Sequence, residues 1–279
     1  MNLLLATLDW YAALGVDEAV SETPWNRFDV PARAAAPAQP AVRPGAIGQP
    51  ATAHPPATQP APPPAPPPQD RPAAMPLSDA GLAAELDSLE TLDALRERLE
   101  RFEGCALKAT AMHTVFGEGP ADARLMIIGE APGEEEDRKG RPFVGPSGQL
   151  LDRMLAAIGL AREEVYITNT IYWRPPGNRT PTQAEVQACQ PFLRRQIAII
   201  RPEVLLLVGG AAAKTMLQRN EGIMRLRGRW AEYDPGSGAP PIPAIATFHP
   251  AYLLRSPAQK REAWRDLLTV QERLLATHG

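Results

Sequence analysis

Short runs of apolar residues alternate along most of the chain with longer segments in which apolar residues recur every three or four positions. The short runs are typical of strands buried on both faces; they span residues 125–128, 165–169, 204–208 and 242–248. The longer segments predict amphipathic helices; they span residues 149–158, 184–200, 211–217 and 260–276. Strands that alternate with helices predict an α/β fold with three layers, α/β/α, and a mostly parallel central sheet.

The pattern divides the chain into three parts. Residues 1–22 carry leucines at helical spacing, which predicts one short amphipathic helix. Because such a helix is marginal alone in water, it either packs on its own domain or serves as a peptide that binds a protein partner. Residues 23–76 are rich in Pro and Ala, and 16 of the 32 prolines fall between Pro31 and Pro76, which predicts a disordered, locally polyproline II tether. Residues 77–279 form the globular domain, which begins with one or two helices up to Gly104, capped by Ser78.

Composition limits the class and location of the protein. The net charge is -3, but residues 181–279 carry 13 basic and 8 acidic side chains; this suits a phosphate-backbone surface and is also common on ordinary proteins. The chain has no run of 18 apolar residues and no basic segment before an apolar leader, so we expect neither a membrane span nor a secretion signal. Cys105 and Cys189 are its two cysteines, so no disulfide framework is implied and a cytoplasmic location is expected.

Three polar side chains stand directly after predicted strands. Glu130 lies on a turn rich in Gly and Pro, Asn169 ends the second apolar run, and His249 follows the last one. Because the carboxyl ends of parallel strands share one edge, we expect these side chains to meet in one crevice. Phe143 lies between glycines, and its broken segment predicts an exposed aromatic. Singly, these residues also fit an acidic surface loop, a turn cap and a satisfied histidine, but together they favour a functional site.

Five motifs resemble those of the family 4 uracil-DNA glycosylases, in the same order and spacing, over about residues 100–273. They are GEAPGEEED at 129–137, GRPFVG at 140–145, YITN at 166–169, RPPGNR at 174–179 and FHPAYLLR at 248–255. The resemblance implies that residues 77–279 form a single α/β/α catalytic domain. It also implies an enzyme that flips uracil out of DNA and hydrolyses its N-glycosidic bond, which starts base excision repair.

The resemblance also implies a role for each of the converging residues. Phe143 would stack on the flipped base, and the Asn169 amide would match the donor at N3 and the acceptor at O4 of uracil, whereas cytosine presents the opposite pair. His249 would donate a hydrogen bond to O2 as negative charge develops on uracil. Glu130 would orient water and face the oxocarbenium-like sugar.

Two neighbouring positions refine this assignment. Ala131 occupies the position at which the better-known uracil-DNA glycosylases carry an aspartate, so the work of that carboxylate falls on Glu130. By analogy, Glu136 would crowd the C5 position of the base and exclude thymine.

Apolar and basic residues near the last motif are candidates for contact with DNA. Those after the histidine are expected in a loop: Tyr252, Leu253, Leu254 and Arg255. One leucine is expected to be the wedge that fills the gap left by the flipped nucleotide and the other to pack in the core, with Arg255 on a phosphate. Arg227, within a run of alternating arginines at 225–229, is expected to line the DNA track.

The chain departs from the family at the iron–sulfur cluster. Family 4 enzymes resemble one another in a [4Fe–4S] cluster held by four cysteines, and the matching positions here are Phe102, Cys105, Trp173 and Cys189. A cubane cluster takes four protein ligands, so we predict that no ordinary [4Fe–4S] cluster is bound and that no cofactor is needed. The aromatic side chains would fill the vacated volume beside two neighbouring buried thiols. The alternative is a two-cysteine metal site completed by a side chain such as His113.

The sequence therefore predicts a monomeric uracil-DNA glycosylase that acts on uracil-containing DNA. The alternative from another class is a non-catalytic DNA-binding or uracil-binding protein that lost activity with the cluster. A nucleotide-binding α/β hydrolase for small molecules is disfavoured because the chain has no phosphate-binding glycine motif. The related branch that cross-links to DNA through an inserted basic, histidine-bearing loop is disfavoured because YWRPPGNR contains no insert.

Overall fold

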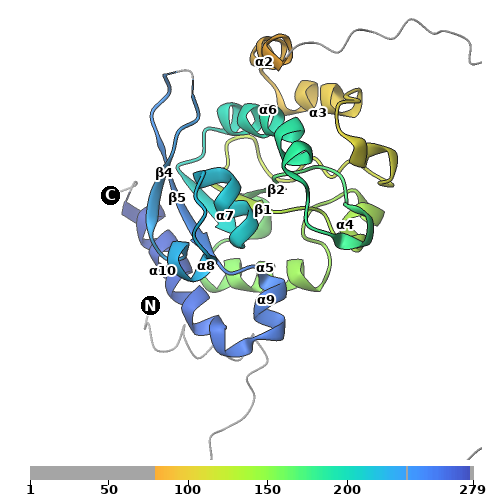
Figure 1. Ribbon diagram of the computed structural model, residues 1–279. Coiled ribbons are helices and arrows are strands. Elements are labelled where there is room, and N and C mark those ends of the chain that lie inside the picture. The colour runs from red at the N-terminus through yellow and green to blue at the C-terminus, as the bar shows by residue number, and fades with distance from the viewer. Residues whose placement is uncertain (1–78, 237, 277–279) are drawn as a thin grey trace, which may run out of the picture. The chain divides into compact units, whose positions relative to one another are not determined.

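The computed structural model describes residues 79–236 and 238–276 (Figure 1). The helix expected over residues 1–22, the tether expected over 23–76 and the expected Ser78 cap lie outside these residues. Of the helices described, none is both long and apolar enough to cross a membrane.

A five-stranded sheet forms the centre of the described domain, with the strand order β2-β1-β3-β5-β4. Neighbouring strands are parallel except β4, which runs antiparallel to β5 at one edge. The strands are β1 Leu125–Gly129, β2 Tyr166–Asn169, β3 Val204–Val208, β4 Trp230–Tyr233 and β5 Ile242–Thr247. The four predicted strands and the mostly parallel sheet are thus confirmed, and β4 is a fifth strand that the sequence analysis did not predict.

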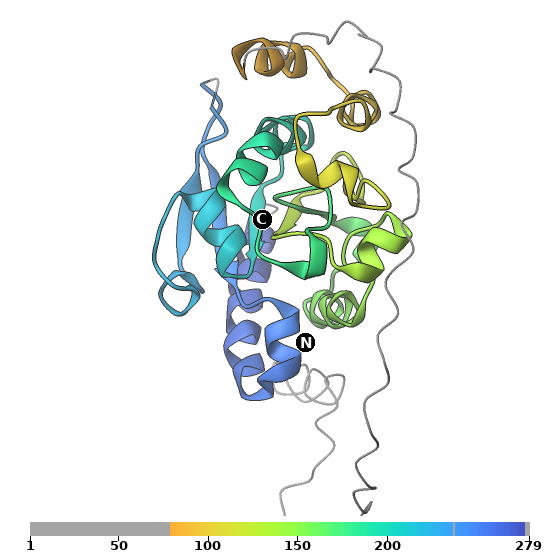
Figure 2. The same ribbon diagram turned by 45° about the vertical axis from the view of Figure 1, so that its right-hand side comes forward.

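Helices lie on both sides of this sheet, as Figures 1 and 2 show. They are α2 Asp79–Asp87, α3 Leu92–Glu100, α4 Glu134–Lys139, α5 Pro146–Ala157, α6 Gln183–Ile200, α7 Gly210–Leu217, α8 Ile223–Leu226, α9 Pro250–Arg255 and α10 Lys260–Ala276. Short 3-10 turns lie in the connections between helices and strands: η1 Ala106–Ala109, η2 Arg162–Glu164, η3 Pro176–Asn178 and η4 Pro257–Gln259.

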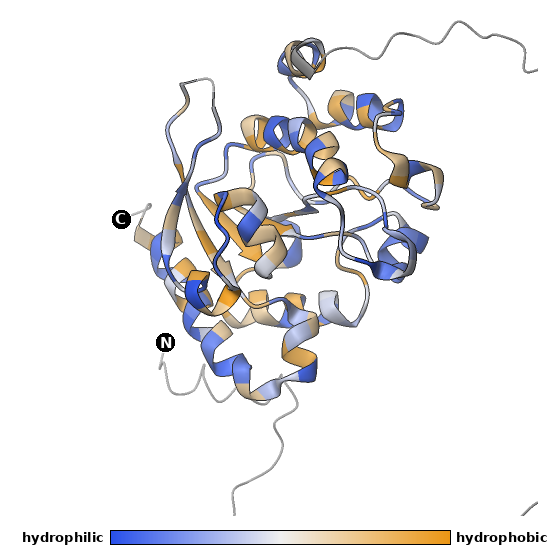
Figure 3. Ribbon diagram, viewed as in Figure 1, coloured by the Kyte–Doolittle hydropathy of each residue, from blue (hydrophilic) through white to orange (hydrophobic). Residues whose placement is uncertain are grey.

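Successive residues of β1 point to opposite faces of the sheet, and each face has its own apolar layer. Leu125 and Ile127 pack with residues of α5, α9 and α10, whereas Met126 and Ile128 pack with residues of α6, α7 and α8. The strands at the centre of the sheet are accordingly hydrophobic in Figure 3. Both faces are covered, which explains the continuous apolar runs and confirms the three-layer α/β/α architecture.

Backbone hydrogen bonds fix the carboxyl ends of the parallel strands at one edge of the sheet. The register of β1 and β2 pairs Gly129 with Asn169, and the Thr170 amide donates to the Gly129 carbonyl oxygen at 2.9 Å. The Gly209 amide after β3 donates to the Thr247 carbonyl oxygen at the end of β5, also at 2.9 Å. Side chains that follow these strands are therefore held at defined mutual positions.

Helix α4 lies where an acidic surface loop was the alternative to a functional site. The Glu136 carboxylate accepts a hydrogen bond from the Gly133 amide at 3.1 Å, Arg138 and Lys139 lie in the last turn, and the helix ends at Gly140 with φ 67°. These are start and stop signals of a helix. With six residues, α4 is too short to show the apolar periodicity by which longer helices are found.

Helix α9 lies where the residues after His249 were expected to form a loop. Pro250 occupies its first position, and Nδ1 of His249 accepts a hydrogen bond from the Ala251 amide at 3.1 Å. Proline at this position and a side-chain acceptor before it are both typical of helix starts. The histidine after β5 thus also caps the helix that follows it.

Candidate active site

A crevice of about 640 Å³ opens at the edge of the sheet where β1, β2 and β5 end. Eight residues singled out from the sequence line it: Glu130, Ala131, Glu136, Phe143, Asn169, His249, Tyr252 and Arg255. A larger hollow of about 1300 Å³ lies beside the amino ends of β3 and β5, next to Glu203 and Ile242. It contains none of the predicted catalytic or binding residues, so the smaller crevice is the candidate active site.

Asn169 presents a buried amide donor to this crevice. The residue is 1% exposed, and its Nδ2 is the buried side-chain nitrogen that lacks a hydrogen-bond partner within residues 79–236 and 238–276. Leaving such a donor unpaired costs about 1–3 kcal/mol, which points to an acceptor supplied by a ligand. Gly129 lies beside it: a Cβ there would stand 2.4 Å from Oδ1 of Asn169 and 2.7 Å from Cζ of Phe143. Glycine at the end of β1 therefore makes room for both side chains.

Phe143 is buried, and the expectation of an exposed aromatic is wrong. The residue is 5% exposed, and its ring stacks near the His249 imidazole, with 5.7 Å between ring centroids and an interplanar angle of 29°. Its φ of 50° lies in the left-handed region, which residues other than glycine rarely adopt. The glycines and proline around it form a tight turn that aims the ring inward, so the broken sequence pattern reflects the turn and not exposure.

His249 is held as a neutral hydrogen-bond donor. Burial lowers the pKa of its imidazole to about 4, with a smaller contribution from the positive charge of Arg255 and an opposing one from Glu136. The ring is therefore neutral at pH 7. Because Nδ1 accepts a hydrogen bond from the Ala251 amide, the proton of the neutral ring lies on Nε2.

Glu130 lies half-buried on the turn after β1. Burial raises the pKa of its carboxyl group because desolvation disfavours the charged form. The Thr170 hydroxyl donates to the Glu130 carbonyl oxygen at 2.7 Å, which fixes the backbone of the turn to the end of β2. A carboxylate is thus held at the crevice by two neighbouring strand ends, with Ala131 beside it.

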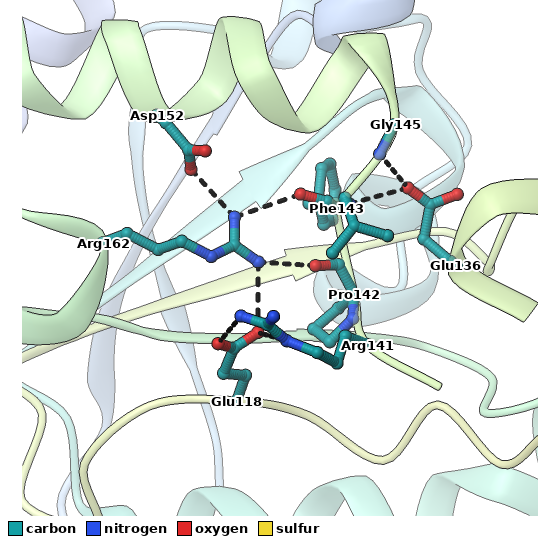
Figure 4. Close-up of polar contacts among 9 residues, drawn as sticks. Glu118, Glu136, Arg141, Pro142, Phe143, Gly145, Asp152 and Arg162 are labelled. Atoms are coloured by element: carbon teal, nitrogen blue, oxygen red, sulfur yellow. Dashed lines mark hydrogen bonds and ion pairs between the residues drawn. The ribbon is translucent and has the colours of Figure 1, made fainter. Parts of the chain in front are cut away.

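Glu136 uses both carboxylate oxygens to hold backbone amides. One oxygen accepts from Val144 at 2.9 Å and from Gly145 at 3.0 Å, and the other accepts from Gly133 at 3.1 Å. These bonds fasten the turn that carries Phe143 to helix α4, as the right-hand side of Figure 4 shows. The exclusion of thymine by Glu136 stays a prediction.

Residues 252–255 separate into crevice, surface and core positions. Tyr252 and Arg255 line the crevice, and the Tyr252 ring packs 5.1 Å from that of Phe248. Leu254 is 42% exposed, whereas Leu253 is 0% exposed and belongs to the core. One leucine packs in the core as expected, so Leu253 is removed from the candidates for DNA contact; the role of Leu254 as the wedge stays a prediction.

The side chain of Arg227, expected to line the DNA track, is largely buried and paired within the domain. Its guanidinium pairs with Asp266 at 2.6 Å and Glu262 at 3.1 Å, and it lies over the Phe248 ring at 5.2 Å. Two carboxylates of α10 neutralise this charge, so the residue ties the segment before β4 to α10. The alternating arginines could not show this, because the carboxylates come more than thirty residues later in the chain.

Comparison with known proteins assigns the chain to a family. The uracil DNA glycosylase superfamily matches residues 116–268, a span that contains all the crevice residues described above. This chain belongs to the uracil DNA glycosylase superfamily.

Within this superfamily, the chain is similar to proteins described as type-4 uracil-DNA glycosylases. That of Thermotoga maritima is 42% identical over 168 residues, which cover 60% of this chain and 85% of that protein. That of Pyrobaculum aerophilum is 39% identical over 180 residues, 63% of this chain and 91% of that protein. That of Archaeoglobus fulgidus is 39% identical over 188 residues, 66% of this chain and 94% of that protein. The chain is thus a member of the type-4 uracil-DNA glycosylases.

In this type-4 uracil-DNA glycosylase, the four positions that the family resemblance gives to cluster ligands lie in one apolar cluster. Cys105, Trp173 and Cys189 are buried in it and Phe102 packs against it. The Trp173 indole donates to the Thr114 hydroxyl at 3.0 Å. A hydrogen bond from Cys189 lowers the pKa of the Cys105 thiol, while the same bond and burial raise that of Cys189. The prediction of neighbouring buried thiols beside two aromatic side chains is confirmed.

This donor set does not fit a [4Fe–4S] cluster, which needs four thiolates or equivalent ligands. In the part of the chain that the structure describes, no group of three or more His, Cys, Asp or Glu side chains could hold a metal ion. His113, the suggested third ligand, lies with Nδ1 2.7 Å from the Asp137 carbonyl oxygen. Aromatic side chains occupy the volume in which the remaining ligands would stand.

The sequence analysis did not identify two residues that support the site. Thr170 fixes the Glu130 turn, and its hydroxyl directly after a strand end was an available signal. Arg162 donates to the carbonyl oxygens of Pro142 and Phe143, at 2.6 and 3.1 Å (Figure 4). It lies 19 positions beyond Phe143 in η2, outside every motif, and nothing in the sequence pattern indicates it.

Proposed function

We propose that this chain, a uracil-DNA glycosylase by family, binds a flipped-out uracil in the crevice and hydrolyses its N-glycosidic bond there. The substrate is uracil-containing DNA, and the reaction starts base excision repair. The observation that carries the proposal is the buried Asn169 Nδ2, which has no partner within the described residues. A neutral imidazole and a half-buried carboxylate line the same crevice.

Recognition rests on the match between the Asn169 amide and the edge of uracil. Nδ2 donates to O4 of the base and Oδ1 accepts from the N3–H group. Cytosine presents an amino donor and a ring acceptor in these places, which would leave the buried Asn169 donor unpaired and set two donors against each other. Sites that read a base or substrate through buried hydrogen bonds reject the mismatched partner by about 10⁴-fold or more. The Phe143 ring replaces the stacking that the base loses on leaving the duplex.

Catalysis rests on charge that develops as the bond between N1 and C1′ breaks. Negative charge accumulates on uracil, and the Nε2–H group of neutral His249 donates to O2 in a buried site where such a bond is worth most. The sugar acquires positive charge, which the Glu130 carboxylate compensates while it orients the attacking water. Both interactions are stronger in the transition state than in the substrate, so they lower the barrier.

Contact with the duplex is proposed for the residues of α9. Leu254 is an exposed apolar side chain on a helix that starts at His249, which suits a wedge beside the base pocket. Arg255 lines the crevice and suits a phosphate. One chain supplies every residue of the proposed site, so a monomer suffices for the reaction.

The test is excision of uracil from a labelled oligonucleotide with one uracil, followed by alkaline cleavage of the strand. The wild type is expected to cleave, and Asn169→Ala is expected to lose at least about 100-fold in single-turnover rate. Met224→Ala is the control, because Met224 is 63% exposed and does not line the crevice. Well-folded wild type that binds uracil-containing DNA without cleaving it would contradict the proposal and indicate a binding protein.

We also propose that packing replaces the iron–sulfur cluster in this chain. The support is the apolar cluster in which Phe102 and Trp173 occupy two ligand positions and the free thiols of Cys105 and Cys189 form a hydrogen bond with each other. Iron and acid-labile sulfide measured on anaerobically purified protein are expected to be far below one equivalent. Four iron atoms per active chain would contradict this proposal and leave the assignment of the crevice intact.

A further inference from the structure

We propose that Arg162 is a positioning residue of the glycosylase, which holds the Phe143 ring in the place where the flipped base stacks. The inference rests on the proposed uracil site. Arg162 does not line the crevice and belongs to η2, the turn that leads into β2. It acts on the base through the backbone of Phe143, by a chain of hydrogen bonds that Figure 4 shows.

The guanidinium of Arg162 binds two successive carbonyl groups of the turn. One terminal nitrogen donates to the Phe143 carbonyl oxygen at 3.1 Å, and the other donates to that of Pro142 at 2.6 Å. The fixed planar fork of a guanidinium can satisfy two acceptors at once, which the single ammonium of lysine does less well. The two carbonyl groups are thereby fixed in direction as well as in position.

Two carboxylates hold the guanidinium itself. Asp152 of α5 accepts from one terminal nitrogen at 2.8 Å, and Glu118 accepts from the other at 3.3 Å. The Arg162 side chain is 14% exposed, so these carboxylates compensate the charge that burial would otherwise penalise. Arg141, at the start of the same turn, binds Glu118 as well. The turn is thus tied to α5 and to the segment before β1.

The backbone of Phe143 needs such support. Its φ of 50° is unfavourable for a residue with a Cβ, and such conformations persist where the surroundings over-determine them. Gly148 lies close to the backbone of Phe143: a Cβ at position 148 would lie 1.8 Å from the Phe143 carbonyl oxygen. Glu136 holds the amides after Phe143 on one side, and Arg162 holds the carbonyl groups on the other. The turn is clamped from both sides, and the ring points into the crevice as a result.

The experiment is a double-mutant cycle on the single-turnover rate of uracil excision, with Arg162→Gln, Phe143→Ala and the double variant. If Arg162 acts through the Phe143 ring, Arg162→Gln lowers the rate by about 10-fold to 100-fold in the wild-type background. In the Phe143→Ala background the same change lowers it by less than about 3-fold, because the ring to be positioned is gone.

Arg98→Gln is the matched control. Arg98 makes a two-bond ion pair with Glu85 at 2.5 and 3.0 Å and has a side chain 16% exposed, but it lies on α3 and does not line the crevice. It is expected to lower the melting temperature about as much as Arg162→Gln while leaving the excision rate of the folded protein unchanged. Arg162→Lys, which keeps the charge but not the fork, is expected to recover stability more than rate.

Equal losses of rate in the two backgrounds would overturn the inference, as would a full rate in folded Arg162→Gln or Arg162→Lys protein. Wild type that excises no uracil would instead overturn the proposed function on which the inference rests. Because Arg162→Lys retains the ion pairs, it keeps the cycle measurable if Arg162→Gln does not fold.

Discussion

At the scale of single residues, the missing side chain of Gly129 is as important to the crevice as the groups that line it. A Cβ at this position would meet the Asn169 amide oxygen and the Phe143 ring well inside contact distance. Gly129→Ala must therefore displace Asn169, which is proposed to read the base, the Phe143 ring, which is proposed to stack on it, or both. Displacements of about 1 Å at a reacting centre cost about 100-fold, so we expect at least this loss in excision rate.

The control for this prediction is Gly222→Ala. A Cβ on Gly222 would meet nothing within 4 Å, and its backbone, with φ −69°, suits any residue. Rates are compared at equal amounts of folded protein, judged by circular dichroism and thermal unfolding. Full activity of Gly129→Ala would show that Asn169 and Phe143 are not confined as described.

The two titratable groups of the crevice predict the pH dependence of the reaction. Burial raises the pKa of Glu130 and lowers that of His249 to about 4. As pH falls from neutrality, the carboxylate that works in its ionised form is protonated while the imidazole is still largely neutral. The excision rate is therefore expected to fall on the acid side with a midpoint above 4.5, the ordinary value for glutamate.

This profile is measured as single-turnover rate between about pH 4.5 and 8. Glu130→Gln is expected to be slower throughout and to lose the acid-side fall, because no ionised carboxylate remains to be protonated. A step near pH 6.5 that persists in Glu130→Gln would mean that His249 titrates as an ordinary imidazole, against its burial and its hydrogen bond to Ala251.

At the scale of elements, Trp173 joins the segment after β2 to the apolar cluster under α2, α3 and α6. It is 1% exposed and its indole is bonded to Thr114. Trp173→Ala removes a large buried side chain and leaves a cavity between these elements, which for aromatic residues costs about 3–5 kcal/mol of the free energy of unfolding. Chemical denaturation measures this loss, with Met224→Ala as a surface control that is expected to change little.

If Trp173→Ala were as stable as the wild type, this would contradict the proposal that packing in the apolar cluster replaces the iron–sulfur cluster. Restoring the ligand set with Phe102→Cys and Trp173→Cys would then be the informative comparison. In the absence of iron, the wild-type protein is expected to be more stable than the variant with both changes, since two cysteines fill less volume than two aromatic rings.

The elements also show what could be predicted from the sequence. Strands buried on both faces and the helices α5, α6, α7 and α10 follow from apolar periodicity, and these were predicted close to their observed bounds. Helices α2 and α3 lie where one or two helices were predicted before Gly104. Helices α4 and α9 have six residues each and depend on caps made by Glu136 and His249, side chains that were interpreted through their chemistry alone. The outward position of Phe143 was a wrong prediction because glycine-rich turns can aim a side chain inward as well as outward.

At the scale of the whole molecule, the site follows from topology more than from any single motif. Parallel strands bring Glu130, Asn169 and His249 to one edge of the sheet, and this convergence could be predicted because it needs only strand order and direction. The contacts of Arg162 and Arg227 could not be predicted from the sequence. Each depends on carboxylates or carbonyl groups from distant segments, and the choice among such partners is made by three-dimensional packing.

The position of β5 in the sheet determines when during synthesis this protein acquires its activity. β5 is the last strand to leave the ribosome, yet it lies between β3 and β4; before it arrives, β4 has no neighbour and His249 is absent from the crevice. We therefore expect that nascent chains that carry Glu130 and Asn169 but lack His249 excise no uracil. A chain divided in the connection between β4 and β5 should give two inactive pieces. Excision restored on mixing them would show that β5 has inserted between β3 and β4 and completed the central sheet.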